Sequence, residues 1–446
     1  MNLKLPCGLC LMIFVVGGAA ADEPRAPAEL IPGARRIATD VQAEGKKAAT
    51  AEAPQVLDAD TDHGTHDARC YVYADYLQWW IRKGPTPILL TTTADPVGNG
   101  LLGEPGTVIL FGENDLDFGS FSGVRLGGGW NFGADQFWGI EVSGFALQTK
   151  NADFSAGPGS AILVRPYLSA LDTTESGVEV NVPGTLRGAF TLDARTQFWG
   201  WDANVVAHSV RDFHRSVDLL AGFRAVTLDE ELQLQENLTL LQEGASIFQR
   251  PPAGVANNII TDLPAGSRIR VIDQFETRNR FYGGQLGGRF QWNRGRLNLE
   301  LLGKIALGVT QQRTTINGVS VLDNNREGHI ETPGGVFALT SNIGQYSQSL
   351  FSVVPEIGIN AQFALTSRVR ACIGYSGLYW SGVARPGEQI DRTINPKLAP
   401  TDQDFTLSGG PGDNFNPARE QSRPRFLDRD NGFWAHGLNF GIEFRY

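Results

Sequence analysis

Apolar and polar residues alternate one by one along many segments of this 446-residue chain, and this pattern limits the folds open to it. The clearest segment is the last, residues 433–446, whose second face carries small or polar residues such as Asn439 and Glu443. Its apolar face consists of Trp434, Leu438, Phe440, Ile442, Phe444 and Tyr446. Because side chains on a β-strand point to opposite faces in turn, the segment predicts a strand with one apolar face.

The same alternation recurs in nine earlier segments, which brings the predicted number of strands to ten. These segments are 70–82, 123–132, 137–146, 195–206, 217–225, 281–292, 297–309, 351–363 and 369–379. Residues 231–241 and 268–277 alternate as well. They either extend one hairpin above the membrane or add two strands, so twelve strands is the second choice.

The connections between these segments alternate between short and long. Short links lie near 133–136, 207–214, 293–296 and 366–367, and long ones span 83–117, 151–191, 231–277, 313–349 and 383–431. Outer-membrane barrels have short periplasmic turns and long extracellular loops. The pattern therefore predicts an all-β, transmembrane, antiparallel up-and-down barrel over residues 70–446. Because the number of strands is even, both termini are expected on the periplasmic side.

A soluble secreted β-sandwich or barrel is the alternative, because a soluble antiparallel sheet also alternates. The membrane is favoured because the segments exceed the usual ~5–6 residues of a strand and because charged residues oppose the large apolar ones. Aromatic residues also gather near strand ends, where they would form interface girdles. These predicted interface aromatics are Trp130, Phe132, Trp138, Trp292 and Trp434.

Composition narrows the class of protein further. The chain holds 53 glycines and only 19% charged residues, which is unfavourable for long helices. No apolar run beyond the N-terminus approaches the ~20 residues of a membrane helix. The formal net charge of −10 argues against nucleic acid as a partner.

Residues 1–21 have the features of a secretory signal peptide: Lys4, an apolar run over 9–16 and a small-residue cleavage site at 19–21. Residues 22–69 are rich in Ala, Pro and charge, which predicts a flexible periplasmic extension. Within it, 58–64 begins like a calcium loop, but Arg69 occupies the position that needs a bidentate Glu. We therefore expect no metal and no cofactor.

Two cysteines remain after the signal peptide, Cys70 and Cys372. The strand assignment places another strand between them, which keeps their Cα atoms too far apart for a disulfide. We expect both to be free thiols.

The segment after residue 70 resembles a known family. The residues that carry the resemblance are 76–80 (YLQWW), 83–87, 100–103 (GLLG), 108–112 (VILFG), 122–126 (SGVRL) and 139–141 (GIE). They resemble the outer-membrane β-barrel porins of family seven, described as putative porins and found in planctomycete-type bacteria. The resemblance implies an outer-membrane barrel with a porin-like role, and it implies no catalytic residue.

The polar faces of the strands predict a charged lumen, since an Arg or Lys facing lipid costs ~2–4 kcal/mol. The predicted lumen residues are Arg125, Glu141, Asp202, Asp218, Arg224, Arg289, Glu300, Lys304, Glu356, Arg370 and Glu443. They either line a narrow hydrated channel or pair and plug it. Pairs on strands joined by short turns, Arg125 with Glu141 and Glu356 with Arg370, would favour plugging.

The leading functional hypothesis is passive diffusion of small hydrophilic solutes or ions. A plugged structural or adhesive barrel that acts through its long loops is the alternative, and an outer-membrane esterase is a remote one because no nucleophile motif surrounds any serine. We expect the bilayer and the barrel-assembly machinery as partners. The assembly signal would be the terminal residues Phe440, Ile442, Phe444 and Tyr446. The sequence leaves the oligomeric state open.

Overall fold

The computed structural model describes residues 69–94, 98–113, 116–133, 136–212, 214–243, 248–249, 259–260, 263–326, 328–401 and 422–446. The predicted signal peptide, the calcium-like segment 58–64 and all of the predicted extension except Arg69 lie outside these residues. No helix in the described ranges is long and apolar enough to cross a membrane.

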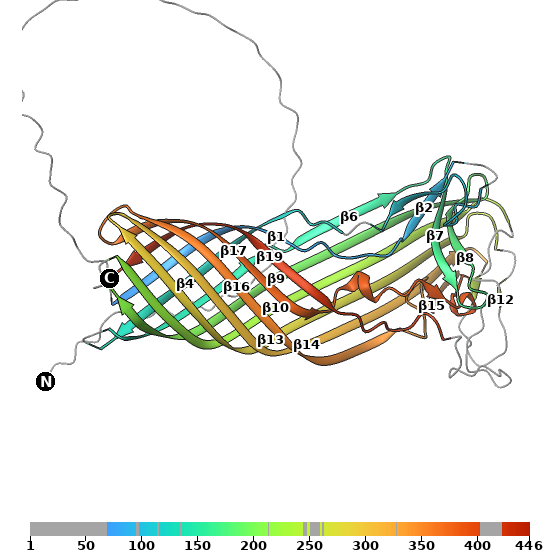
Figure 1. Ribbon diagram of the computed structural model, residues 1–446. Coiled ribbons are helices and arrows are strands. Elements are labelled where there is room, and N and C mark those ends of the chain that lie inside the picture. The colour runs from blue at the N-terminus through green and yellow to red at the C-terminus, as the bar shows by residue number, and fades with distance from the viewer. Residues whose placement is uncertain are drawn as a thin grey trace, which may run out of the picture. The chain divides into compact units, whose positions relative to one another are not determined.

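Ten antiparallel strands form a closed ring (Figure 1). In ring order they are β1 (Cys70–Ile81), β4 (Ser120–Phe132), β5 (Trp138–Leu147), β9 (Leu186–Arg211), β10 (Arg215–Leu240), β13 (Arg268–Arg294), β14 (Leu297–Asn324), β16 (Gly344–Ala364), β17 (Val369–Val383) and β19 (Asn431–Arg445). The ring closes because β19 pairs with both β17 and β1, while β9 pairs with both β5 and β10. The predicted ten-stranded barrel is confirmed.

The two ends of the ring differ as the connection lengths predict. At one end, the backbones of Cys70 and Tyr446 exchange two hydrogen bonds, and the links after β4, β9, β13 and β16 are short. Gly295 has a φ of +59° in the link between β13 and β14, a conformation that glycine adopts without steric cost. We call this end the short-turn end and the opposite end the long-loop end.

The twelve-strand alternative is wrong. Residues 231–240 and 268–277 belong to β10 and β13, whose 26 and 27 residues reach well beyond the 12 residues of β1. The predicted loops 151–191, 231–277 and 313–349 are likewise largely strand. They contain the outer parts of β9, β10, β13, β14 and β16, together with β6 (Lys150–Ala156), which pairs with β9, and β15 (Gly328–Pro333), which pairs with β14.

Along these long strands the same alternate positions point inward throughout, but the apolar residues change from the outer to the inner face part-way along. On the short-turn side of β10, Leu219 is 55% exposed on the outer face, while Asp218 is buried inside. Further along the same inner face, Leu232 and Leu234 are 1% and 0% exposed, and the outer face carries Gln233 and Gln235. The ring therefore has a half with a polar interior inside an apolar outer band, and a long-loop half with an apolar core, as in a water-soluble barrel.

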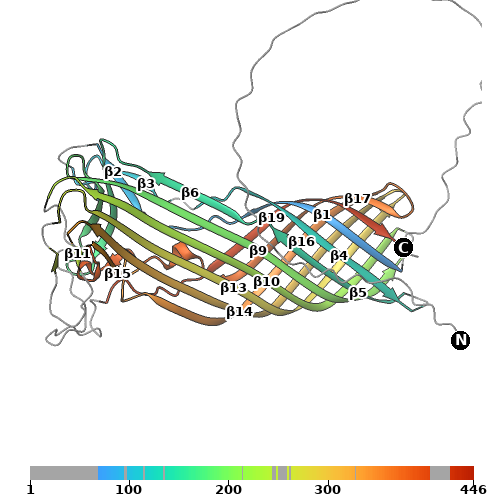
Figure 2. The ribbon, with the colours of Figure 1, turned by 180° about the vertical axis from the view of Figure 1, so that it is seen from behind.

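A smaller sheet lies at the long-loop end (Figures 1 and 2). It consists of β2 (Leu90–Thr93), β3 (Val108–Phe111), β7 (Ile162–Ser169), β8 (Glu175–Asn181) and β18 (Thr393–Ile394). The remaining elements are the two-residue pair β11 (Phe248–Gln249) and β12 (Ile259–Ile260) and the 3₁₀ turns η1 (Pro386–Gln389) and η2 (Pro396–Leu398). We call the small sheet the loop sheet, because it joins three connections that are far apart in sequence.

Both cysteines in the described part of the chain are free thiols, as predicted. Strand β19 lies between β1, which carries Cys70, and β17, which carries Cys372.

Candidate functional site: the barrel interior

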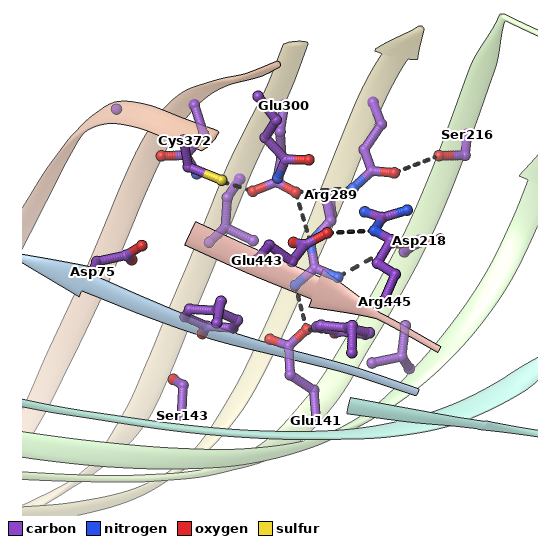
Figure 3. A pocket seen from close by; sticks show the side chains of 18 of the residues that line it. Asp75, Glu141, Ser143, Ser216, Asp218, Arg289, Glu300, Cys372, Glu443 and Arg445 are labelled. Atoms are coloured by element: carbon purple, nitrogen blue, oxygen red, sulfur yellow. Dashed lines mark hydrogen bonds and ion pairs between the residues drawn. The ribbon is translucent and has the colours of Figure 1, made fainter. Parts of the chain in front are cut away.

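A cavity of about 150 Å³ occupies the interior of the ring near the short-turn end. Its wall comes from most strands of the ring and includes Tyr71, Asp75, His208, Cys372 and Arg445. Charged and polar side chains dominate this wall (Figure 3). The lumen is therefore hydrophilic, but it is small for a solute pathway.

The structure places all of the predicted lumen residues on the inner face of the ring. The side chains of those that form ion pairs are at most 13% exposed. Eight of them line the cavity: Arg125, Glu141, Asp218, Arg289, Glu300, Lys304, Glu356 and Glu443. Asp202, Arg224 and Arg370 are buried beside it, with 5%, 3% and 6% of their surface exposed.

Arg289 on β13 joins one group of these charges (Figure 3). Its guanidinium contacts Glu141 of β5 across the lumen. Its Nη1 lies 3.7 Å from Asp218 Oδ2, and its Nε lies 3.5 Å from Glu300 Oε2. Tyr71 donates its hydroxyl to the same Glu141, with an oxygen–oxygen distance of 2.5 Å. One arginine thus links three carboxylates, which come from β5, β10 and β14.

A second group surrounds Asp202 and Glu356. Arg224 contacts both carboxylates, with 3.0 Å between its Nη2 and Asp202. Lys304 of β14 lies 3.2 Å from Asp202 of β9, and Arg125 of β4 lies 3.7 Å from Glu356 of β16. Two or more strands separate the partners of these last two pairs along the ring, so these ion pairs cross the lumen rather than follow its wall.

The predicted pairs Arg125–Glu141 and Glu356–Arg370 do not form. Register is the reason: Glu141 lies opposite Gly129, not Arg125, and Arg370 lies opposite Ala364, far along β16 from Glu356. A short turn makes two strands neighbours, but it does not place two chosen residues opposite each other.

A layer of aromatic rings fills the interior on the long-loop side of the charges. Trp79 packs on Phe145 with 5.5 Å between ring centroids, Phe145 on Phe198 at 5.1 Å, and Phe198 on Phe433 at 5.1 Å. Phe198 belongs to β9 and Phe433 to β19, which stand on different sides of the ring. Trp79, Phe198 and Phe433 are 0–1% exposed. We call these four rings the aromatic layer.

On the long-loop side of this layer, Arg165 of β7 forms ion pairs that connect the loop sheet to the barrel wall. Its Nη1 lies 2.6 Å from Glu236 of β10 and its Nη2 2.8 Å from Asp273 of β13, and all three side chains are fully buried. The guanidinium also lies 4.6 Å from the ring centroid of Phe337. Burial raises the pKa of the Glu236 carboxyl, an effect that Arg165 opposes.

Asp273 also holds a loop between β15 and β16. Its Oδ1 accepts the backbone N–H groups of Val336, Phe337 and Ala338 at 2.9, 3.1 and 2.8 Å. A second buried arginine, Arg385, pairs with Glu230 of β10 and lies over the ring of Phe433. The long-loop end is therefore closed by buried ion pairs as well as by apolar packing.

The aromatic residues predicted at the interfaces lie on the outer face of the ring. Trp130, Phe132, Trp138 and Trp434 are 43–53% exposed, and Trp292 is partly exposed. His436 lies on the same outer face of β19 and contacts the Tyr375 hydroxyl through Nδ1 at 2.6 Å. Residues proposed as the assembly signal, Phe440, Ile442, Phe444 and Tyr446, also face outward, with 41–66% of their surface exposed.

Sequence reasoning missed the lumen residues of β1 and of the end of β9. Tyr71 and Asp75 line the cavity, and His208 Nδ1 lies 2.6 Å from Asp218. A signal for the β1 residues was available, because Tyr71, Tyr73 and Asp75 share one parity in an alternating segment. Among the described residues, no group of three or more His, Cys, Asp or Glu side chains is placed to hold a metal ion.

A sequence profile of one family, described as Putative beta barrel porin-7, matches residues 71–446. The chain belongs to this family. In outer-membrane barrels the short turns lie at the periplasmic end and the long loops at the extracellular end. A comparison with curated proteins found no match.

Solved structures similar to this porin-7 member are outer-membrane proteins. The outer membrane protease OmpT of Escherichia coli matches at 9% identity and a TM-score of 0.39, over 85% of this chain and 97% of that one. A FadL homologue of Pseudomonas aeruginosa matches at 9% identity and a TM-score of 0.19, over 85% and 90% of the two chains. A mutant porin of Rh. blastica matches at 9% identity and a TM-score of 0.12, over 84% and 99%.

Proposed function

We propose that this porin-7 family member is an outer-membrane barrel with a closed lumen, which anchors and presents the extracellular long-loop half as a structural or adhesive surface. The observation that carries the proposal is the contact between Phe198 and Phe433 across the interior. This contact joins β9 to β19, and with Trp79 and Phe145 it places four large apolar rings between the charged cavity and the long-loop end. The proposal is that these rings block the lumen. The ion pairs that cross the lumen support the same conclusion.

Passive diffusion of small hydrophilic solutes or ions is the second candidate. It is favoured by the family's description and by the charged cavity near the periplasmic mouth. In this reading the aromatic layer moves aside, and the cross-lumen charges set which ions pass. A ten-stranded ring lies close to the eight-stranded size that side chains just fill, so such a pore would be narrow.

Conductance in a planar bilayer separates the two candidates. The purified, refolded chain is expected to insert without producing current steps, because Trp79, Phe145, Phe198 and Phe433 exclude hydrated ions. A variant with Phe198→Ala and Phe433→Ala, confirmed as folded by circular dichroism and by a heat-dependent gel shift, is expected to conduct. Discrete, salt-dependent steps from the unaltered chain would overturn the closed-barrel proposal and support passive diffusion.

The proposal includes export by a signal peptide in residues 1–21, residence in the cell outer membrane and no catalysis. An esterase would need a serine and a histidine that converge on one site. His208 contacts Asp218 and Asn131, and His436 contacts Tyr375. Hydrolysis of a chromogenic ester by the folded barrel, lost in an H208Q or H436Q variant, would restore the esterase alternative.

A further inference from the structure

Three arginines stand on the outer face of β13 and β14 directly beyond the apolar band. On β13 the outward residues from the short-turn end include Leu286 and Tyr282, 63% and 42% exposed, and the next outward residue is Arg280. Arg278 follows two positions later. We call Arg278, Arg280 and Arg313 of β14 the arginine patch.

The outer face of β14 changes character at the same level. Leu307 and Val309 are 48% and 44% exposed, and the next outward residues are Gln311 and Arg313. In the pairing of the two strands, Arg280 lies opposite Gln311 while Tyr282 lies opposite Val309. The change from apolar to polar or cationic residues thus occurs at one height on both strands, which is the level where lipid headgroups are expected.

The arginine patch concentrates like charge. Arg278 and Arg313 are directly opposite each other on neighbouring strands, a position in which like charges destabilise a sheet because their Cβ atoms are only ~5 Å apart. Arg280 is the diagonal neighbour of Arg313. An arrangement of this kind is unfavourable unless an anion neutralises it.

The nearby carboxylates neutralise only part of the patch. Glu276 lies 3.9 Å from Arg278, in a pair whose side chains are 50% and 28% exposed, and Asp229 of β10 lies opposite Arg278. Both carboxylates are beside Arg278, and Asp229 also interacts electrostatically with Arg280. Within the described residues, neither Arg280 nor Arg313 has an ion pair, and the residues opposite Arg313 and Gln311 on β16 are Ser347 and Ser349.

We propose that Arg280 and Arg313, together with Arg278 and Gln311, bind the phosphate group of a membrane lipid in the extracellular leaflet. Guanidinium groups bind phosphate oxygens through two parallel hydrogen bonds, which an ammonium cannot reproduce. A lipid is favoured over a free anion because the strip of Leu286, Leu307 and Val309 directly below offers a surface for its acyl chains. The site depends on the band facing lipid, and it does not depend on whether the lumen conducts.

Lipid retention measured by native mass spectrometry tests the proposal. The full chain is refolded in dodecyl maltoside, incubated with phosphatidic acid and, separately, with phosphatidylcholine of the same acyl chains, and then washed. The unaltered barrel is expected to retain phosphatidic acid in preference to phosphatidylcholine. The R280Q/R313Q variant is expected to retain at least tenfold less phosphatidic acid.

The matched control is R268Q/R270Q. Arg268 and Arg270 are exposed on the same outer face of β13 but lie far into the long-loop half. This variant loses the same charge and is expected to retain phosphatidic acid as the unaltered barrel does. Equal losses from the two variants, or no loss from R280Q/R313Q, would overturn the site.

A second version of the retention experiment distinguishes a lipid ligand from a free anion. Inorganic phosphate at millimolar concentration is added during the wash. Retention that survives this addition supports a lipid ligand held by both its headgroup and its chains. Complete displacement by inorganic phosphate would overturn the lipid assignment and identify a site for free phosphate.

Discussion

At the scale of single residues, Arg165 is the side chain whose removal should have the largest effect on the long-loop half. Replacing it with Met leaves Glu236 and Asp273 buried without a cation. Breaking a buried ion pair in this way costs ~3–5 kcal/mol. We expect R165M to raise the rate of proteolysis in the loop sheet at native conditions, while the transmembrane strands stay protected.

Arg392 provides the control for this prediction. It pairs with Glu175 of β8 at 2.9 Å, but the two side chains are 21% and 34% exposed. An exposed pair contributes only ~0–1 kcal/mol. R392Q should therefore be cleaved almost as slowly as the unaltered chain, and equal cleavage of R165M and R392Q would contradict the role of Arg165.

His329 of β15 gives a prediction about pH. Hydrogen bonds to Asp323 and then to Glu331 raise the pKa of its imidazole above the usual 6.5. The contacts thus favour the charged ring, and their contribution is complete below pH 6.5 and is lost as pH rises through the higher, folded-state pKa. An NMR titration should show His329 titrating above 6.5, and D323N should lower that pKa; a midpoint at or below 6.5 would contradict these contacts.

The sequence predicts that the charged lumen residues point inward, but it does not predict which of them form ion pairs with each other. The face to which a side chain points depends only on whether its position along the strand is odd or even, which is a local property of the backbone. The partner of Arg125 is Glu356, which stands on the far side of the ring. That pairing depends on strand tilt, register and closure, none of which a single segment encodes.

At the scale of the strand, the reversal of polarity is the main feature that sequence analysis did not reach. The segments 231–241 and 268–277 alternate with the same period as the membrane parts. In β10 the apolar set moves from odd positions such as Leu219 to even positions such as Leu232. Alternation alone does not distinguish a new strand from the continuation of a strand whose surroundings change from lipid to water, so the sequence is compatible with both alternatives.

Two substitutions on one strand test this reversal. Leu301 and Asn317 both face outward from β14, the first within the apolar band and the second in the long-loop half. An arginine near the middle of the lipid-facing band costs ~2–4 kcal/mol. L301R should therefore lower the free energy of unfolding in lipid vesicles by about that amount, measured by urea titration, since its charge faces hydrocarbon.

N317R is the matched control, because its arginine would face water. It should change the free energy of unfolding by less than ~0.5 kcal/mol, as surface substitutions usually do. Similar losses for L301R and N317R would mean that the apolar band does not end where the outward residues turn polar.

At the scale of the whole molecule, closure at the long-loop end could not be predicted from local patterns. The loop sheet joins β2, β7 and β18, which come from three different connections, and β18 pairs with β7 in parallel. Each of these strands has eight residues or fewer. Such short pieces carry little periodic signal, and their pairing depends on contacts between loops that the closed ring brings together.

The same ring makes the last strand both a structural element and the proposed signal for assembly. Strand β19 pairs with β1 and β17, so deleting it would open the barrel and could not separate the two roles. Phe444 and Tyr446 face outward, 41% and 66% exposed, and do not pack in the core. Point substitutions of these two residues can therefore test recognition while closure is kept.

We expect F444A/Y446A to lower the amount of folded barrel in the outer membrane of expressing cells severalfold, measured by its heat-dependent gel shift. The yield of refolding into vesicles should stay near that of the unaltered chain, because insertion into lipid alone depends only on the apolar outer band. The control is F351A/F363A on β16, which removes two outward phenylalanines, 73% and 48% exposed, away from the terminus. If both variants lose the same amount in cells, or if F444A/Y446A also fails in vesicles, the terminal aromatics act in folding and not in recognition by the assembly machinery.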